Sequence, residues 1–308
     1  MEAGIQIDGV SKVFRSGIRR NKVTAVDDLH LEVKPGSVVA FLGPNGAGKT
    51  TTIYMLLGLL RPDTGTVRLL GGSPGDASIR RKIGYQSEIF HTYPFRTARG
   101  ALRFYGRLSG LRGADLEERI EAQLTRVGMK AAADRKVGTF SKGMVQRLGL
   151  AQALLHEPEL LILDEPATGL DPQGRRMVSD LIIEQQQRGA TVFFSSHVLA
   201  DIERTCDHVV MINQGRVVYS HPVSALAGER ETWYIEVNGW NDAVEESLPD
   251  VIPAEKLDGR AVLACGVEDK HDLLRALLDK PVEIGTVKRK RRTIEDIYMD
   301  RIGTAPDA

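Results

Sequence analysis

The 308-residue sequence predicts an α/β fold with four parts: an N-terminal antiparallel β subdomain, a parallel-sheet core, a helical insertion and a small C-terminal α+β appendage. Three observations support this. An apolar strand at 37–42 runs directly into a glycine-rich loop and an amphipathic helix at about 49–60, as parallel α/β sheets begin. Helical periodicity dominates between about 97 and 152. Apolar strand signals then return at 160–163, 191–194 and 208–212.

The chain is longer than most single domains, so one full domain with a smaller appendage is expected. We place the full domain at 1–224, with its helical subdomain at about 88–156. Short alternating strands joined by turns are predicted at 5–39. The appendage, 225–308, is expected to be an accessory or regulatory domain. Its predicted helices are at 242–248, 270–278 and 293–301.

Composition argues against several classes of protein. Lys plus Arg and Asp plus Glu number 41 each, so bulk charge predicts no nucleic-acid partner. Two cysteines without CxxC spacing indicate a reducing compartment. No apolar run reaches the ~18 residues of a spanning helix, and the first residues do not resemble a signal peptide. Any membrane role is therefore expected to depend on a separate spanning subunit.

The glycine-rich loop fits the pattern G-x-x-x-x-G-K-[ST] between a predicted strand and a predicted helix, which is the context of a P-loop. Its residues are Gly43, Pro44, Asn45, Gly46, Ala47, Gly48, Lys49 and Thr50. Backbone N–H groups of such a loop point at phosphate oxygens. We expect Lys49 to reach the β- and γ-phosphates of ATP and Thr50 to offer its hydroxyl to Mg²⁺. Thr51 and Thr52 can extend the phosphate contacts.

Two acids, Asp164 and Glu165, follow the apolar strand at 160–163. Carboxylates at the carboxyl end of such a strand lie where open α/β sheets bind ligands. Asp164 is expected to hold Mg²⁺ through its water shell, and Glu165 to orient or deprotonate the attacking water. Without the P-loop, the same pattern would indicate a strand that enters a solvated turn.

Further motifs make about 5–219 resemble the ATP-binding subunits of ABC transporters. The segment Phe140-Ser141-Lys142-Gly143-Met144 is similar to the family's L-S-G-G-Q signature. The resemblance implies a P-loop NTPase core of ABC type, in which Ser141, Gly143 and Met144 contact an ATP molecule held by the opposite subunit. An ordinary serine N-cap is the alternative for Ser141.

Lys142 and Met144 depart from the family's signature, where a glycine and a glutamine stand. Similar S-K-G-M sequences occur in the branch whose partners are ABC-2 type exporters. The substitutions therefore favour that branch. Whether Lys142 adds a charge near the phosphate or is simply solvated stays open.

Other family motifs follow in order. Thr168-Gly169-Leu170-Asp171 is similar to the D-loop, which implies that Asp171 lies at the ATP site, with a simple turn as the alternative. His197 matches the switch histidine, which the family uses to hydrogen-bond the γ-phosphate and the catalytic glutamate. Phe14 falls where the family stacks an aromatic ring on adenine, although core packing is an equal alternative.

The Q-loop departs from the family's I-G-Y-x-x-Q pattern. Alignment of Ile83-Gly84-Tyr85 with this pattern places Glu88 at the glutamine, with Gln86 two residues early. We assign Glu88, because a carboxylate can bind Mg²⁺ or the attacking water. The choice between Glu88 and Gln86 stays open.

Two surface features also stand out. Five aromatic residues crowd one stretch: Phe90, Tyr93, Phe95, Phe104 and Tyr105. In the family this region receives a helix of the membrane subunit, so some of the five are expected to line that groove and others to pack inside the helical subdomain. The basic run at 288–292 is expected to be a solvated loop, with contact to anionic headgroups as the second reading.

The motifs and the family resemblance together imply an ATPase subunit whose catalytic residues are Lys49, Glu165 and His197. Two copies would close head to tail over two Mg-ATP molecules and drive a separate ABC-2 type permease from the cytoplasmic face of the membrane. The transported substrate is not predicted. A soluble ABC ATPase acting on ribosomes or DNA is the alternative, although the chain carries one such domain and no coiled-coil or zinc insertion.

Overall fold

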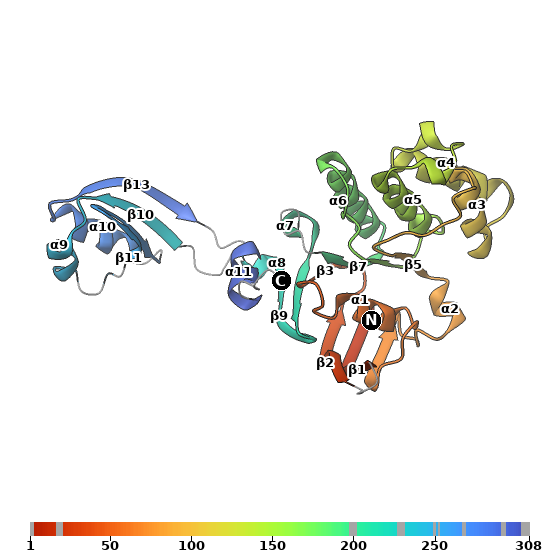
Figure 1. Ribbon diagram of the computed structural model, residues 1–308, viewed down its shortest axis with the longest axis horizontal. Helices are drawn as coiled ribbons and strands as arrows, with labels where there is room; N and C mark the ends of the chain where they lie inside the picture. The colour runs from red at the N-terminus through yellow and green to blue at the C-terminus, as the bar shows by residue number, and fades with distance from the viewer. Residues whose placement is uncertain are drawn as a thin grey trace. The chain divides into compact units, whose positions relative to one another are not determined.

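A computed structural model describes residues 3–16, 21–196, 202–226, 232–248, 251, 253–266, 269–290 and 294–302. The chain forms two compact units (Figure 1). The smaller unit spans 223–300, and the larger unit comprises 1–222 and the end of the chain. None of the helices in the described ranges is both long and apolar enough to cross a bilayer.

The larger unit begins with a three-stranded antiparallel sheet, as the sequence predicted. β1 (Ile5–Ser16) and β2 (Asn21–Val33) form a long hairpin, and β4 (Thr64–Leu69) pairs with the other edge of β1. Alternate residues of β1, including Ile5 and Ile7, are buried, which matches the two-residue period of a strand with one solvated face.

The core of the larger unit is a six-stranded sheet in the order β5–β6–β7–β3–β8–β9, in which only β9 is antiparallel. Three inner strands are buried over their whole length, which explains their unbroken apolar sequence. The strands are β3 (Val38–Leu42), β5 (Ile83–Gln86), β6 (Leu160–Leu163), β7 (Thr191–Ser196), β8 (His208–Asn213) and β9 (Arg216–Pro222).

Helices complete this core. α1 (Lys49–Leu56) ends four residues earlier than predicted, because Gly58 adopts a left-handed backbone with φ +66°. α6 begins at Pro172, with Asp171 as its N-cap. The helices of the core are α1, α2 (Ala77–Arg80), α6 (Pro172–Gln187) and α7 (Ile202–Thr205).

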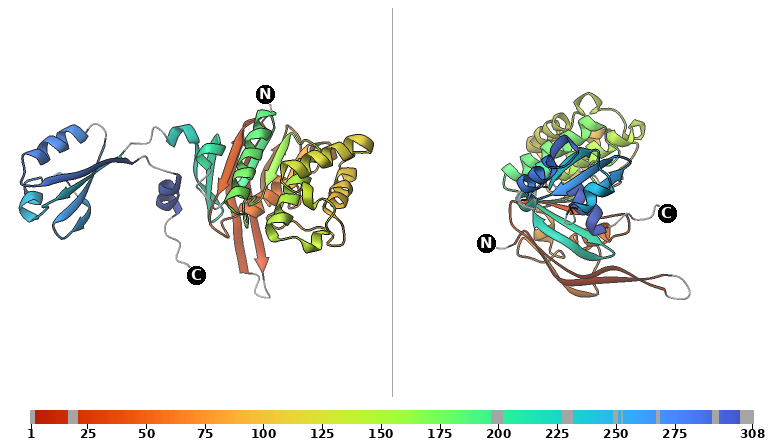
Figure 2. Two further views of the ribbon diagram at one scale, coloured as in Figure 1. Left: turned by 90° about the horizontal axis from the view of Figure 1, so that it is seen from above. Right: turned by 90° about the vertical axis from the view of Figure 1, so that its left-hand side faces the viewer.

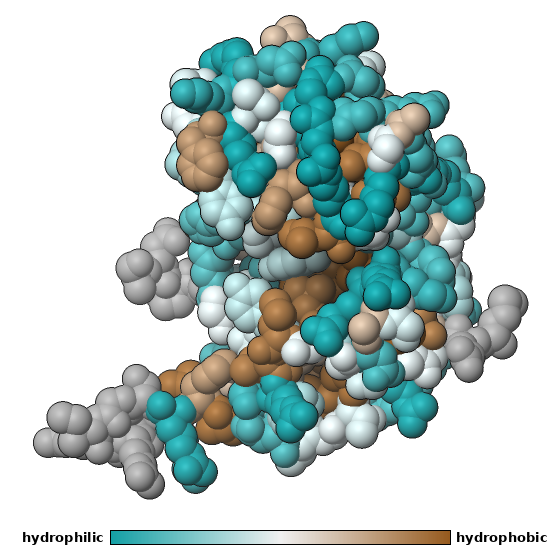
Figure 3. Space-filling model, turned by 90° about the vertical axis from the view of Figure 1, so that its right-hand side faces the viewer, coloured by the Kyte–Doolittle hydropathy of each residue, from teal (hydrophilic) through white to brown (hydrophobic). Residues whose placement is uncertain are grey.

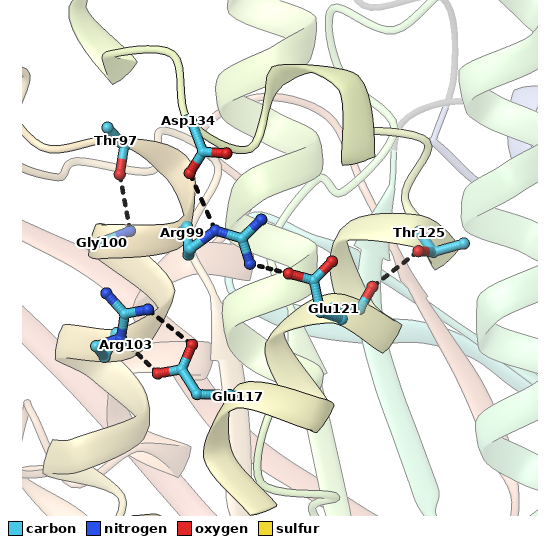
Figure 4. A network of polar contacts seen from close by, with 8 residues as sticks. All are labelled: Thr97, Arg99, Gly100, Arg103, Glu117, Glu121, Thr125 and Asp134. Carbon is cyan, nitrogen blue, oxygen red and sulfur yellow. Dashed lines mark hydrogen bonds and ion pairs between the residues drawn. The ribbon is translucent and has the colours of Figure 1, made fainter. Parts of the chain in front are cut away.

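The predicted helical insertion lies to one side of the strands in Figure 2. It contains α3 (Ala98–Leu108), α4 (Gly113–Arg126) and α5 (Lys142–Leu154), with short 3-10 turns at Lys130–Ala132 and Val137–Thr139. Arginines of α3 bond acids of α4 in Figure 4. These ion pairs are partly exposed and contribute little to stability, so the buried leucines between the helices hold the insertion together.

The smaller unit is a four-stranded antiparallel sheet in the order β11–β12–β10–β13. Its strands and helices follow the chain order β-α-β-β-α-β, which is a split βαβ, or ferredoxin-like, arrangement. The predicted α+β appendage is therefore present. Its elements are β10 (Thr232–Asn238), α9 (Asp242–Glu246), β11 (Pro253–Leu257), β12 (Arg260–Cys265), α10 (Lys270–Leu278) and β13 (Glu283–Lys290). α8 (Val223–Leu226) precedes it, and α11 (Ile294–Ile302) follows it.

The smaller unit has its own core, so a cavity there should leave the larger unit intact. Leu263, fully buried in this core, packs with Ile235 and Val237. Leu263→Ala is expected to cost about 2–5 kcal/mol of the stability of this unit alone. Hydrogen exchange followed by mass spectrometry should show faster exchange in 232–290 and unchanged exchange in β3 and β6. The matched control is Leu278→Ala, since Leu278 is 74% exposed. Equal loss of protection in both units would contradict the prediction.

Candidate functional site

The sequence motifs converge at one edge of the six-stranded sheet. The glycine-rich loop follows β3, the acids Asp164 and Glu165 follow β6, Gln86 ends β5, and Ser195 and Ser196 end β7. These four strands are parallel neighbours, so their carboxyl ends meet at the same edge. Ligands of open α/β sheets bind at this edge.

The loop between β3 and α1 needs glycine at two points. A Cβ on Gly43 would lie 2.4 Å from the carbonyl oxygen of Ile212, and one on Gly48 would lie 2.4 Å from the carbonyl oxygen of Ala25. Gly48 also has φ +109° and gives α1 no side-chain cap. The first N–H groups of α1 are therefore open toward the loop, which is the arrangement that binds phosphate.

A cavity of about 230 Å³ lies over this loop. Its wall consists of Ala25, Pro44, Asn45, Gly46, Gly48, Lys49, Thr50, Thr51, Glu88 and Glu165. Lys49 Nζ donates to the Gly43 carbonyl at 2.6 Å and lies 3.4 Å from Glu165 Oε1. The side chains of Lys49 and Glu165 are only 7% and 9% exposed. A nearly buried cation and a nearly buried carboxylate therefore stand together in the wall of the cavity.

Oxygen atoms that suit Mg²⁺ lie beside this cavity. Thr50 Oγ1 donates to Asp164 Oδ2 at 3.1 Å, and Ser195 Oγ donates to Asp164 Oδ1 at 2.6 Å. Burial raises the pKa of Asp164, while the hydrogen bonds from Ser195 and Thr50 oppose the rise. A hard cation prefers such hydroxyl and carboxylate oxygens and would favour the charged form of Asp164. The residues present therefore fit Mg²⁺.

The two Q-loop candidates occupy different places. Glu88 is part of the cavity wall. Gln86 is fully buried, and its Nε2 donates to the backbone carbonyl of Gln146 on α5 at 3.2 Å. This geometry favours Glu88 as the residue that faces a bound nucleotide, and the assignment stays a prediction.

The signature segment lines a separate pocket of about 600 Å³. Ser141, Gly143, Met144 and Asp171 all belong to its wall, and no residue of the P-loop does. Ser141 Oγ accepts from Met144 N at 3.3 Å, so Ser141 is the N-cap of α5. Asp171 Oδ1 accepts from Gly174 N at 2.9 Å and caps α6. Both residues therefore place a helix N-terminus at this pocket.

The remaining predicted residues are His197, Phe14 and Lys142, of which Lys142 belongs to the wall of the same pocket as Ser141. His197 is outside the described residues. Phe14 lies on β1, is exposed, and is not part of the described cavity wall. The aliphatic chain of Lys142 packs along Gly169, where a Cβ would lie 3.1 Å from Lys142 Cδ. Lys142 is thus directed along the D-loop segment.

The prediction of a loop at 288–292 is wrong for residues 288–290. Residues 288–290 belong to β13, where they pair with β10, and Lys288 Nζ lies 3.3 Å from Glu236 Oε1. Charged residues are common on edge strands, because they oppose pairing with another chain. Residues 291–293 lie outside the described part of the chain.

The five aromatic residues form one connected cluster. The ring centroid of Tyr93 lies 5.5 Å from that of Phe95, in a tilted pair, and 5.6 Å from that of Phe104, in an edge-to-face pair. Phe104 in turn lies 5.2 Å from Tyr105, which lies 5.8 Å from Phe90. Phe90 is buried, whereas Phe95 is 67% exposed. Figure 3 shows hydrophobic side chains gathered in a hollow on the face that carries α2 and α3. The cluster thus has both a packed part and an open part.

Comparison with known proteins gives a consistent result. Residues 26–168 match the family model described as "ABC transporter". The chain is 34% identical to the Nod factor export ATP-binding protein I of Paraburkholderia xenovorans, with 98% of each chain covered. It is 36% identical to the bacitracin transport ATP-binding protein BcrA of Bacillus licheniformis, with 91% of this chain and 92% of that one covered. A solved dimeric structure of MJ0796, a bacterial ABC transporter cassette, is 26% identical with a TM-score of 0.63, covering 71% of this chain and 98% of that one.

Proposed function

Because this chain belongs to the ABC transporter ATP-binding family, we propose that it powers an ABC-2 type exporter by closing head to tail with a second copy of itself over two ATP molecules. Members of this family are ATPases that dimerise and act with membrane permease subunits. The two relatives named for Nod factor export and bacitracin transport support the exporter branch. They do not favour a soluble ATPase of ribosomes or DNA.

The observation that carries the proposal is the separation of two half-sites in one chain. Phosphate-binding features line the cavity over the P-loop, and the helix N-termini of α5 and α6 line a different pocket. A second copy, turned head to tail, can place its Ser141 and Gly143 against the γ-phosphate held by the first P-loop. ADP lacks that phosphate, so ATP favours the closed dimer and hydrolysis favours release.

The residues of the cavity divide the chemical work. The loop amides and Lys49 bind the phosphates and offset their charge. Thr50, Asp164 and Glu88 would hold Mg²⁺, which when bound withdraws charge from the phosphate oxygens. Glu165 orients and deprotonates the attacking water, and we assign His197 to hydrogen-bond the γ-phosphate.

We place the subunit at the cytoplasmic face of the membrane, docked to its permease through the exposed aromatic residues. Tyr93 and Phe95 are large, open apolar side chains held by a packed cluster. Rigid aromatics of this kind are typical anchors of protein interfaces. We expect an apolar helix end of the membrane subunit to pack against these two side chains.

Docking can be tested separately from hydrolysis. Phe95→Asp is expected to weaken binding to the permease by at least about thirtyfold, because it puts a charge in the apolar anchor. The measurement is co-purification of the membrane protein that accompanies the unaltered chain. The control Leu278→Asp introduces the same charge at an exposed leucine of the smaller unit. ATP hydrolysis by the isolated subunit should be unchanged in both variants. Undiminished co-purification of Phe95→Asp would exclude this docking surface.

A further inference from the structure

Glu165 has an unusual backbone. Its φ is +48°, a left-handed conformation that residues with a side chain rarely adopt. Such strain persists only where surrounding contacts hold it, and it concentrates at functional sites. The contacts that hold the backbone of Glu165 in this conformation therefore bear on its proposed role as the base.

On one side, Ser195 holds the backbone N–H of Glu165. Glu165 N donates to Ser195 Oγ at 2.8 Å, and the same hydroxyl donates to Asp164 Oδ1 at 2.6 Å. Ser195 lies at the end of β7 and is fully buried. One hydroxyl thus joins the backbone of the proposed base to the carboxylate of the proposed metal ligand.

On the other side, Gln146 holds the backbone carbonyl. Its Nε2 lies 3.3 Å from the carbonyl oxygens of Glu165 and Pro166 and donates to both. Gln146 is 3% exposed and lies on α5, five residues after Ser141. Its own backbone carbonyl accepts from Gln86 Nε2 at 3.2 Å, so β5 supports its position.

We propose that Gln146 and Ser195 are positioning residues that hold the backbone of Glu165, and so aim its carboxylate at the attacking water. This inference rests on the proposed role of Glu165. Ser141 caps the helix that carries Gln146, so a shift of α5 relative to β6 changes the bonds to Glu165. Contact of Ser141 with the partner's nucleotide is thereby linked to the orientation of the base in its own chain.

The test removes each bond with the least change of shape. Gln146→Met keeps the length of the side chain without its amide, and Ser195→Ala removes only the hydroxyl. Each is expected to lower kcat by about ten- to a hundredfold, with little change in KM, since a small misplacement of a reacting group has effects of this size. The control is Gln123→Met, which removes a similar buried bond, from Gln123 Nε2 to the Leu154 carbonyl at 3.4 Å. It should leave kcat near the original value.

A second set of variants, made in the Glu165→Gln protein, distinguishes a loss of positioning from general damage to the fold. In the Glu165→Gln protein, residual hydrolysis is measured by single-turnover release of radiolabelled phosphate. Addition of Gln146→Met should then cause no further loss, because the base that it aims is already gone, whereas Ser195→Ala should lower hydrolysis further, since it also removes the bond to Asp164. An equal loss from Gln146→Met in both backgrounds, or unchanged kcat in the single variants, overturns the proposal. Full hydrolysis by Glu165→Gln alone would instead overturn the proposed role of Glu165.

Discussion

Glu165→Gln is expected to lower ATP hydrolysis by at least about a hundredfold while leaving ATP bound. The amide keeps the size of the side chain but can neither accept the proton of the attacking water nor attract it as a carboxylate does. Because hydrolysis is the step that opens the proposed dimer, the variant should accumulate as a closed dimer with ATP. Phosphate release measures the first effect, and light scattering after gel filtration in ATP measures the second.

The matched control for this variant is Glu159→Gln. Glu159 lies just before β6, is exposed, and pairs with Lys82 on the surface. Its neutralisation should change neither hydrolysis nor the oligomeric state, since exposed ion pairs contribute little. A Glu165→Gln protein that binds ATP and remains a monomer would contradict head-to-tail closure.

Lys49→Ala is expected to impair the step before hydrolysis, which is the binding of ATP. It removes the nearly buried cation that lies 2.6 Å from the Gly43 carbonyl oxygen and 3.4 Å from Glu165 Oε1. A charge-assisted bond to phosphate contributes about 1.5–3 kcal/mol, so ATP affinity should fall by about ten- to a hundredfold. The variant also loses the ammonium group that pairs with the Glu165 carboxylate. The rate of hydrolysis should therefore fall by a larger factor than the ATP affinity. Titration calorimetry with Mg-ATP measures the affinity.

Two lysines serve as comparisons for Lys49. Lys82→Ala removes an exposed lysine beside β5 and should bind Mg-ATP as the unaltered chain does. Lys142→Gly restores the glycine of the family's signature, and near-normal hydrolysis would show that Lys142 adds no charge to the phosphate. Unchanged ATP affinity after Lys49→Ala would remove the P-loop from the proposed site.

Some residues of the candidate site could be identified from the sequence because their chemistry depends on a short, local pattern. The P-loop places glycines, a lysine and a threonine within eight residues, between elements that hydrophobic periodicity reveals. The acids after β6 are recognisable for the same reason. Ser195 and Gln146 lie in motifs that the sequence also shows, yet their bonds to Glu165 were not predicted. These bonds join residues 30 and 19 positions apart, and no local pattern encodes such pairing.

The boundaries of helices and strands were likewise predictable only where a local sequence pattern sets them. α10 has the predicted bounds, Lys270–Leu278, because its apolar residues recur with a clear helical period. The basic run at 288–292 suggested a loop, but its first residues pair with β10 at the edge of the sheet, where the side chains of Lys288 and Arg289 remain exposed, so strand pairing and solvation of the charges are compatible.

By itself, the sequence determined the two-part α/β architecture, the P-loop, and the family, since each depends on the order of residues along the chain. Only the tertiary structure decided which side chains meet. It placed Glu88 at the cavity and Gln86 in the core, although two positions separate them, because β5 ends at Gln86 and the chain bends at Glu88. It also held Glu165 in a left-handed conformation through β7 and α5, a constraint that arises only when distant segments pack together.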